Sequence, residues 1–442
     1  MQSVMRTLLC AAAAITVSLL TACGSGSGTT TPATIRVVND TTAPNVTLSL
    51  NGLATVSAAT QVTSGYASVT PSTYTLSVAT PTGLTGAASS VGLGTAQNYT
   101  ALAYERGNNI YSAVYSDNQA TPSTGFSSLD VANVSSDAGP LDIYLVPHSA
   151  GTPSLTGYQP TFSSVQGLST ATTLASTAPA SGSTAAIAWD IVVTKAAAPN
   201  DVRLTLSNPN FVSAQPYTLV LTATAGGGLV NSVLIPQGLT TAVFTPSSQA
   251  RVRVWSALPI ASAIPVTVQV GTTTLSVANA PSPTPYQLVP ALSTVTAISL
   301  NGSPIATLPT GSFAAGGDYT ILIYGAGTPS SGVAAALILT DNNQVVANYA
   351  SVRLINAAVP GSGGLTMYVA NAEGASSVTY PTASTGTAAY VYTGVKPASA
   401  APINLIGSGY TGAQSNGQFT SGSVYTAMVY DAALPPLIVQ DR

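Results

Sequence analysis

Few residues of this chain could do acid–base, nucleophilic or metal chemistry. It has one histidine, His148, two cysteines, Cys10 and Cys23, and 13 acidic residues in 442. Metal sites usually combine several His or Cys ligands, and no Gly-x-Ser-x-Gly nucleophile elbow occurs. Paired carboxylates for glycoside hydrolysis must face each other across a cleft, whereas these acids are scattered. We therefore predict no catalytic residue, no metal and no cofactor, and we place His148 on a surface loop.

The residue whose covalent chemistry we do predict is Cys23. It closes the run Leu20, Thr21, Ala22, Cys23, which follows a basic residue, Arg6, and an apolar stretch. This order is typical of a secretory signal, and its ending resembles a bacterial lipobox. We expect cleavage after residue 22 and acylation of Cys23, so that the lipid bilayer is a partner. A conventional signal peptide with a coincidental cysteine is the alternative.

The predicted location follows from the residues after Cys23. Gly24 is not the aspartate that retains many lipoproteins at the inner membrane, which favours the outer membrane of a bacterial cell envelope. Residues 23–33 are rich in Gly, Ser and Thr, a composition typical of a flexible tether. The sequence leaves open whether the protein faces the periplasm or the cell surface.

Composition excludes other classes of protein. Only 5% of residues are charged and the formal net charge is -3, whereas nucleic-acid binding needs clustered Lys and Arg. Disordered chains are poor in apolar residues, but this one is 45% hydrophobic. With Cys10 in the predicted leader and Cys23 acylated, no disulfide is expected, so apolar cores must provide the stability.

Internal repetition predicts the fold. Four opening strands share an alternating pattern, at 35–39, 129–133, 252–256 and 352–356, and a second alternating strand follows each one. Alternation is the signature of a half-buried strand, and such strands with Gly, Pro and Asn turns indicate sandwiches. We predict an all-β chain of tandem antiparallel β-sandwich (Ig-like or related) repeats, at 34–122, 123–247, 248–346 and 347–442. The second repeat is divergent, with a long loop near 149–183 that could hold an added strand.

The same alternation predicts which charged side chains face solvent. Arg36, Arg253 and Arg353 occupy one repeat position on the polar side of the opening strands, where they would discourage pairing of sheet edges. Asp142 and Asp190 alternate with apolar neighbours and are expected to face solvent as well. Asp117 and Asp341 each precede an asparagine. They could help to hold Ca²⁺, but an Asx-type turn is the simpler interpretation.

Tyrosine is the remaining candidate for binding, with 20 copies against six Phe and two Trp. Tyr99, Tyr217, Tyr319 and Tyr425 recur with the repeat, so we expect them to be structural, in the manner of a tyrosine corner. One hairpin of the first repeat carries aromatic and charged residues that the repeat does not require. These are Tyr104, Arg106, Tyr111 and Tyr115, and we predict them as a candidate site for a glycan or protein partner.

The opening Arg-Val-x-Asn strand, the segment Val69–Leu76 and the Tyr-Thr strand starts resemble the bacterial domain-of-unknown-function 4397 family. The resemblance covers nearly all of residues 34–442 and is diffuse in the second repeat. It implies a β-sandwich and an envelope location, and it transfers no catalytic residue. The expected function is a non-enzymatic, lipid-anchored envelope protein with a structural, surface or adhesion-type role. A lipoprotein that binds glycan or cell-wall polysaccharide is the first alternative, and an envelope hydrolase is the second.

Overall fold

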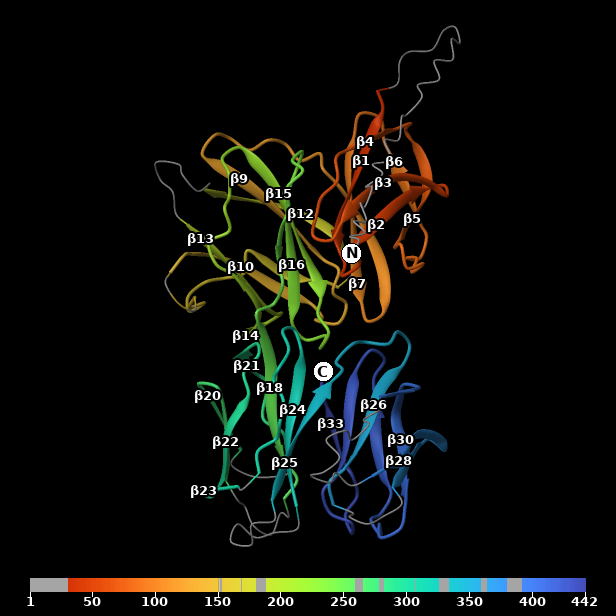
Figure 1. Cartoon of the computed structure of the whole chain (residues 1–442), viewed down its shortest axis with the longest axis vertical. Coiled ribbons are helices and arrows are strands. Elements are labelled where there is room, and N and C mark those ends of the chain that lie inside the picture. Colours follow the sequence, from red (N-terminus) through yellow and green to blue (C-terminus); the bar gives the residue numbers. More distant parts are fainter. Residues whose placement is uncertain are drawn as a thin grey trace, which may run out of the picture.

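The computed structural model describes residues 31–442 except 150, 152, 168, 180–187, 259–264, 278–281, 306, 326–333, 359–363 and 380–391. Within this part of the chain the regular elements are strands, and no helix is long and apolar enough to cross a membrane. The strands build four sandwiches of two sheets each, arranged two by two (Figure 1). The predicted all-β fold of tandem sandwiches is therefore confirmed.

Each sandwich has an inner sheet, which contains the opening strand and faces a neighbouring sandwich, and an outer sheet. The first inner sheet has the order β4 (Ala67–Val69), β1 (Ala33–Asp40), β7 (Asn98–Arg106), β8 (Asn109–Ser116). Its outer sheet has the order β3 (Leu53–Ala59), β2 (Asn45–Leu50), β5 (Ser72–Ala79), β6 (Ser89–Leu93).

The second sandwich has the one five-stranded sheet among the described residues. Its inner sheet has the order β12 (Ser169–Pro179), β9 (Phe126–Asn133), β15 (Gln215–Ala223), β16 (Val230–Pro236), β17 (Val243–Thr245). Its outer sheet has the order β11 (Phe162–Val165), β10 (Leu141–Pro147), β13 (Trp189–Lys195), β14 (Ala198–Leu206). The predicted long loop near 149–183 thus contributes two strands, β11 and β12, one to each sheet.

The third and fourth sandwiches repeat the plan of the first. The third has β21 (Gln287–Pro290), β18 (Gln249–Ser256), β24 (Asp318–Tyr324), β25 (Ala335–Asp341) inside and β20 (Thr273–Val277), β19 (Val266–Val270), β22 (Val295–Leu300), β23 (Ser303–Pro304) outside. The fourth has β29 (Thr393–Val395), β26 (Ala350–Asn356), β32 (Val424–Val429), β33 (Leu437–Gln440) inside and β28 (Ala372–Val378), β27 (Leu365–Val369), β30 (Ala398–Ile406), β31 (Ser415–Phe419) outside.

One strand pair in every inner sheet is parallel, which departs from a wholly antiparallel sandwich. The opening strand pairs in parallel with the strand that carries the Tyr-Thr dipeptide: β1 with β7, β9 with β15, β18 with β24 and β26 with β32. The chain builds the outer sheet between these two strands and re-enters the inner sheet from the same end. This register places Arg36 beside Thr100, Arg253 beside Thr320 and Arg353 beside Thr426.

The second strands β2, β19 and β27 alternate as predicted, but β10 and the opening strands do not. In β2, Val46, Leu48 and Leu50 are buried while the residues between them are half-buried. In β26 every residue is buried. The expectation that opening strands are half-buried is therefore wrong, because their outward face is covered by the next sandwich.

Two apolar clusters join the sandwiches in pairs. Between the first and second, Val38, Leu102 and Tyr104 pack on residues of β9, β15 and β16 such as Val220 and Ile235. Between the third and fourth, Trp255 and Leu322 meet Ile355 and Met428. Burial of large apolar side chains is the main favourable term in such contacts, so each pair of sandwiches shares an apolar interface that resembles a core.

A tight turn of the second sandwich contacts the third sandwich and so links the first pair of sandwiches to the second pair. Gly226, between β15 and β16, donates its N–H to Gly316 O at 2.9 Å and accepts from Asn343 N at 2.9 Å. Gly227 has φ +83°, and a Cβ there would lie 2.8 Å from the carbonyl carbon of Asn343. Only glycine meets both demands without strain, so this turn can seat the second sandwich on the third.

Candidate functional site

An arginine, a threonine, an aspartate and a tyrosine form a buried cluster in three of the inner sheets. In the third sandwich, Arg253 Nε donates to Thr320 Oγ1 at 2.9 Å, and Thr320 Oγ1 donates to Asp341 Oδ2 at 2.6 Å. The Tyr286 hydroxyl also donates to Asp341 Oδ2, at 2.5 Å, and its ring lies under the guanidinium, 4.6 Å away. The equivalent residues are Arg36, Thr100, Asp117 and Tyr66 in the first sandwich and Arg353, Thr426, Asp441 and Tyr392 in the fourth.

The prediction that Arg36, Arg253 and Arg353 face solvent is therefore wrong, because their exposed fractions are 0%, 3% and 0%. Their strands are central in the inner sheet, and the neighbouring sandwich covers the polar side. The Asx-turn interpretation of Asp117 and Asp341 is also wrong, since both carboxylates accept hydrogen bonds from distant hydroxyl groups and pair with arginine.

In the third and fourth sandwiches, the arginine of each cluster pairs with the aspartate of the other cluster. Arg253 Nη2 lies 2.7 Å from Asp441 Oδ1, and Arg353 Nη2 lies 2.6 Å from Asp341 Oδ1, in an ion pair whose angles depart from hydrogen-bond geometry. Burial alone would raise the pKa of Asp341, but Arg353 and Arg253 together hold it below its ordinary value. Breaking a buried pair leaves an uncompensated charge, which is strongly destabilising. The two pairs therefore fix how these sandwiches meet.

The second sandwich has other residues at the arginine and aspartate positions of the cluster. Asp130 occupies the arginine position, as its pairing with Thr218 shows, and Gln237 occupies the aspartate position. Gln119 bridges them by donating its Nε2 to Asp130 and its main-chain N–H to Gln237 Oε1 at 3.1 Å. Burial raises the pKa of Asp130 to about 6. Across this interface Arg36 donates instead to the main chain, to Pro236 O at 3.0 Å and to Leu239 O.

The recurring tyrosines confirm their predicted structural role. Each hydroxyl accepts the main-chain N–H five residues earlier, at 2.9–3.0 Å, in the pairs Tyr99–Gly94, Tyr217–Val212, Tyr319–Ala314 and Tyr425–Thr420. In three sandwiches a phenylalanine six residues earlier packs edge-on against the ring, as in Phe313–Tyr319, with centroids 5.1 Å apart. This hydroxyl fixes the turn before the Tyr-Thr strand.

The candidate binding hairpin lies at the junction between sandwiches. Tyr104 and Tyr115 are 4% and 6% exposed within the cluster between the first and second sandwiches. Tyr111 stacks on Tyr104 with ring centroids 5.7 Å apart, and burial raises the pKa of Tyr104 to about 12. Arg106 binds Asp137 through two hydrogen bonds of 2.7 and 2.8 Å. The structure thus gathers the three tyrosines in the interface cluster and places Arg106 on Asp137, and these four residues form no exposed aromatic row.

Two further aspartates that were expected to face solvent are buried. Asp142 is 4% exposed, and it accepts the main-chain N–H of Ser164 and Ala197. Asp190 is fully buried and contacts His148 Nδ1 at 2.7 Å. Both hold loops in place, so the prediction for Asp142 and Asp190 is wrong. The lipobox residues Leu20, Thr21, Ala22 and Cys23 lie outside the described residues.

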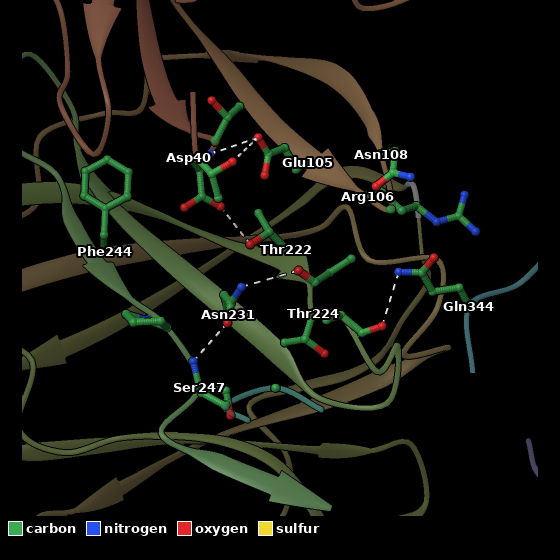
Figure 2. A pocket seen from close by; sticks show the side chains of 18 of the residues that line it. Asp40, Glu105, Arg106, Asn108, Thr222, Thr224, Asn231, Phe244, Ser247 and Gln344 are labelled. Carbon is green, nitrogen blue, oxygen red and sulfur yellow. Dashed lines mark hydrogen bonds between the residues drawn. The ribbon is translucent and has the colours of Figure 1, made fainter. Parts of the chain in front are cut away.

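A cavity of about 540 Å³ lies where the first, second and third sandwiches meet (Figure 2). Asp40 and Glu105 lie on its first-sandwich side, and Thr222, Asn231 and Phe244 lie on its second-sandwich side. The third sandwich contributes residues 315 and 316, and the segment after it contributes Gln344. The volume is in the range of small-molecule sites, which combine apolar walls with a few convergent polar groups.

The two carboxylates of this cavity have different environments. Asp40 Oδ2 accepts from Thr222 Oγ1 at 2.8 Å, while Glu105 Oε1 accepts from both the N–H and the hydroxyl of Thr42 at 2.9 Å. Burial raises the pKa of Asp40 to about 7, and the nearby charge of Glu105 adds to this rise while the bond from Thr222 opposes it. These acceptors, with the hydroxyl and amide groups around them, can hydrogen-bond a hydroxylated ligand. The part of the chain that the structure describes has no group of three His, Cys, Asp or Glu residues placed to hold a metal ion.

Sequence reasoning missed this cavity. Asp40 directly follows an opening strand, and Thr222 and Phe244 lie about 180 to 200 residues further along the chain. No spacing signal connects them, since they meet only because separate sandwiches pack together. The one available signal was Glu105, which lies in the candidate hairpin between Tyr104 and Arg106.

Comparisons with known proteins agree with the sequence resemblance over the first part of the chain. Residues 33–144 match the family model described as "Domain of unknown function (DUF4397)". The curated proteins contain no match. Among solved structures, a "putative cell adhesion protein" from Bacteroides uniformis is similar at 12% identity, over 49% of this chain and 98% of that one, with a TM-score of 0.22. That score is too low to support an argument about this chain. The predicted resemblance to this family is thus confirmed over residues 33–144, the segment that matches its model.

Proposed function

We propose that the protein is a non-enzymatic, lipid-anchored protein of the bacterial cell envelope with a structural, surface or adhesion-type role. The observation that supports this proposal best is the reciprocal pairing of Arg253 with Asp441 and of Arg353 with Asp341. A chain of independent binding modules does not need buried charges in its interfaces. A body that presents its surface from one membrane anchor needs its domains in a fixed arrangement, and these ion pairs hold the third sandwich to the fourth.

Anchoring can be tested at Cys23. In cells that express the full chain, Cys23→Ser should abolish incorporation of labelled palmitate and release the protein from the membrane fraction. Cys10→Ser is the matched control, because it removes the other cysteine and should leave labelling unchanged. Palmitate incorporation into Cys23→Ser would contradict the anchor.

The surface role needs a separate readout. Protease added to whole cells should degrade the wild-type protein, and expression of the wild type should increase attachment of cells to a surface or to each other. Full protection from protease together with unchanged attachment would contradict a surface or adhesion-type role and favour the periplasm.

Glycan binding is the second candidate function, and the cavity of Figure 2 supports it. Thr222, Asn231 and Asp40 offer donors and acceptors, and Phe244 offers an apolar ring on which a sugar could stack. In calorimetry with neutral cell-wall oligosaccharides, Phe244→Ala should weaken binding at least tenfold. Phe126→Ala, at an exposed phenylalanine outside the cavity, should not. Equal affinities for the two variants would exclude this cavity as the site.

A further inference from the structure

Positive charge gathers around a second cavity, of about 1030 Å³, where the second, third and fourth sandwiches meet. The chain has only ten Lys and Arg residues and a net charge of -3. Four of the ten line this cavity: Lys195, Arg203, Arg251 and Arg442. Such a concentration in an acidic protein makes this cavity a basic site.

Acidic neighbours neutralise only part of this charge. Arg251 binds both oxygens of Asp318, at 2.7 and 2.6 Å, and Arg203 Nη2 binds Asp201 at 2.7 Å. Asp441 also lines the cavity, but it is engaged with Arg253 and Thr426.

Lys195 and Arg442 have no such partner. Among the residues that the structure describes, no ion pair within 4.0 Å includes either of them, and Arg442 Nη2 donates only to a main-chain oxygen, Ser136 O, at 2.8 Å. Two cationic groups on the wall therefore remain for a ligand.

Two buried donors also lack partners at this cavity. Arg203 is 7% exposed, and its Nε has no hydrogen-bond partner in the described structure; the same is true of Arg442 Nη1. Unsatisfied buried donors are costly, and a bound acceptor would relieve that cost. Burial, together with the charges of Arg203, Arg251 and Arg106, lowers the pKa of Arg442 to about 10 against the opposing effect of Asp137. An anion between these groups would remove that repulsion.

The rest of the wall fits an organic ligand better than a bare ion. Pro140, Pro285 and Leu288 give apolar surface, and Asn200 and Gln287 give amide groups. Asn200 and Gln287 are exposed, so the cavity is open to the surface.

We propose that this cavity binds an anionic sugar, a hydroxylated ligand that carries a carboxylate or a phosphate. Its oxyanion lies between Lys195 and Arg442, and its hydroxyl groups meet Asn200, Gln287 and Asp201. Charge-assisted hydrogen bonds of this kind are roughly twice as strong as neutral ones. The site is separate from the cavity at Asp40, whose titratable lining groups, Arg106 excepted, are acidic.

The chain is well suited to a direct test because it has only two lysines, Lys195 and Lys396. The purified full-length protein is acylated with an amine-reactive reagent, and labelling of each lysine is followed by mass spectrometry. The probes are galacturonate, glucose 6-phosphate, galactose and inorganic phosphate. Galacturonate or glucose 6-phosphate should reduce labelling of Lys195 at least fivefold without changing Lys396.

The four probes separate the possible ligands. Protection by galacturonate alone assigns the carboxylate, and protection by glucose 6-phosphate alone assigns the phosphate. The proposal would be overturned if galactose protected Lys195 as well as the anionic sugars do. It would also be overturned if inorganic phosphate protected as well as glucose 6-phosphate and galacturonate gave no protection. Absence of protection by all four probes would overturn it as well.

Variants locate the binding. Calorimetry with the protecting sugar should show affinity reduced about tenfold or more in Lys195→Gln and in Arg442→Gln, since each loses one charge-assisted hydrogen bond. Lys396→Gln makes the same change of charge at an exposed lysine outside the cavity and should bind like the wild type. Lys195 is exposed, so its variant should fold, and melting temperatures check this for Arg442→Gln. Wild-type affinity in Lys195→Gln would contradict the proposal.

Discussion

Arg253 of the third sandwich and Asp441 of the fourth form an ion pair of 2.7 Å that crosses the interface between two repeats. Each residue also belongs to the cluster of its own sheet, where Arg253 Nε binds Thr320 and Asp441 Oδ2 accepts from Thr426. Each of these two repeat positions thus serves both the inner sheet of its own sandwich and the contact with the neighbouring sandwich.

Removing Arg253 should therefore destabilise two sandwiches at once. Arg253→Met leaves Asp441 buried without its cation, and we expect a loss of about 3–5 kcal/mol in the free energy of unfolding. Urea titration followed by the fluorescence of Trp255, which is fully buried at this interface, measures it. The double variant Arg253→Met/Asp441→Asn should recover part of the loss, because no charge is then left unpaired. A double variant as unstable as the sum of the two single variants would contradict the ion-pair account.

The tyrosine of each Tyr-Thr strand should contribute through its hydroxyl. Tyr319→Phe keeps the ring against Phe313 but leaves the Ala314 N–H without its acceptor. We expect a loss of about 1 kcal/mol by thermal or chemical denaturation. The matched control is Tyr349→Phe, at a tyrosine that is 41% exposed, where stability should not change. Equal effects at both positions would mean that the hydroxyl of Tyr319 does not stabilise the turn.

Replacing a buried aspartate by asparagine should have opposite effects on stability in the first and second sandwiches. Asp117→Asn should cost about 3–5 kcal/mol in the free energy of unfolding, because Arg36 is then buried without its counter-charge. Asp130→Asn should be neutral or stabilising at pH 8, because the Asp130 carboxylate has no cation and one of its oxygens lacks a partner among the described residues. Denaturation of both variants at pH 8 tests this contrast, and a large loss in Asp130→Asn would refute it.

Asp40 should make stability depend on pH. Its pKa is about 7 in the folded protein against an ordinary value of 3.8, so the folded state binds the proton more tightly. Stability therefore falls as the pH rises from about 4 to about 7. Asp40→Asn should be more stable than the wild type at pH 8, by about 2 kcal/mol after allowance for the open side of the cavity. This difference should vanish near pH 4, and melting curves at pH 4, 6 and 8 measure it. A difference that does not change with pH would show that Asp40 does not titrate in this range.

The sandwiches could be predicted because their signals are local. Alternation in segments such as Val46–Leu50 and the recurrence of Tyr-Thr reflect contacts within one repeat, and the structure has both. The parallel pairing of β1 with β7 was not visible, since alternation carries no information on strand direction. Tyr104, Arg106, Tyr111 and Tyr115 lie in the β7–β8 hairpin, and binding by this hairpin stays a prediction. The burial of this hairpin was not predictable, because the residues that cover it belong to the second sandwich and lie far from it in the sequence.

The sequence alone determined an all-β chain of repeated sandwiches, because strand periodicity is a property of the chain itself. The tertiary structure alone decided which polar residues are inside. Arg36, Arg253 and Arg353 look like surface residues within their own strands, and they are buried only because a neighbouring sandwich covers that face. The same packing brings Asp40 to Thr222 and Lys195 to Arg442. Both cavities therefore exist only in the assembled four-sandwich body, because their walls come from segments that no single repeat contains.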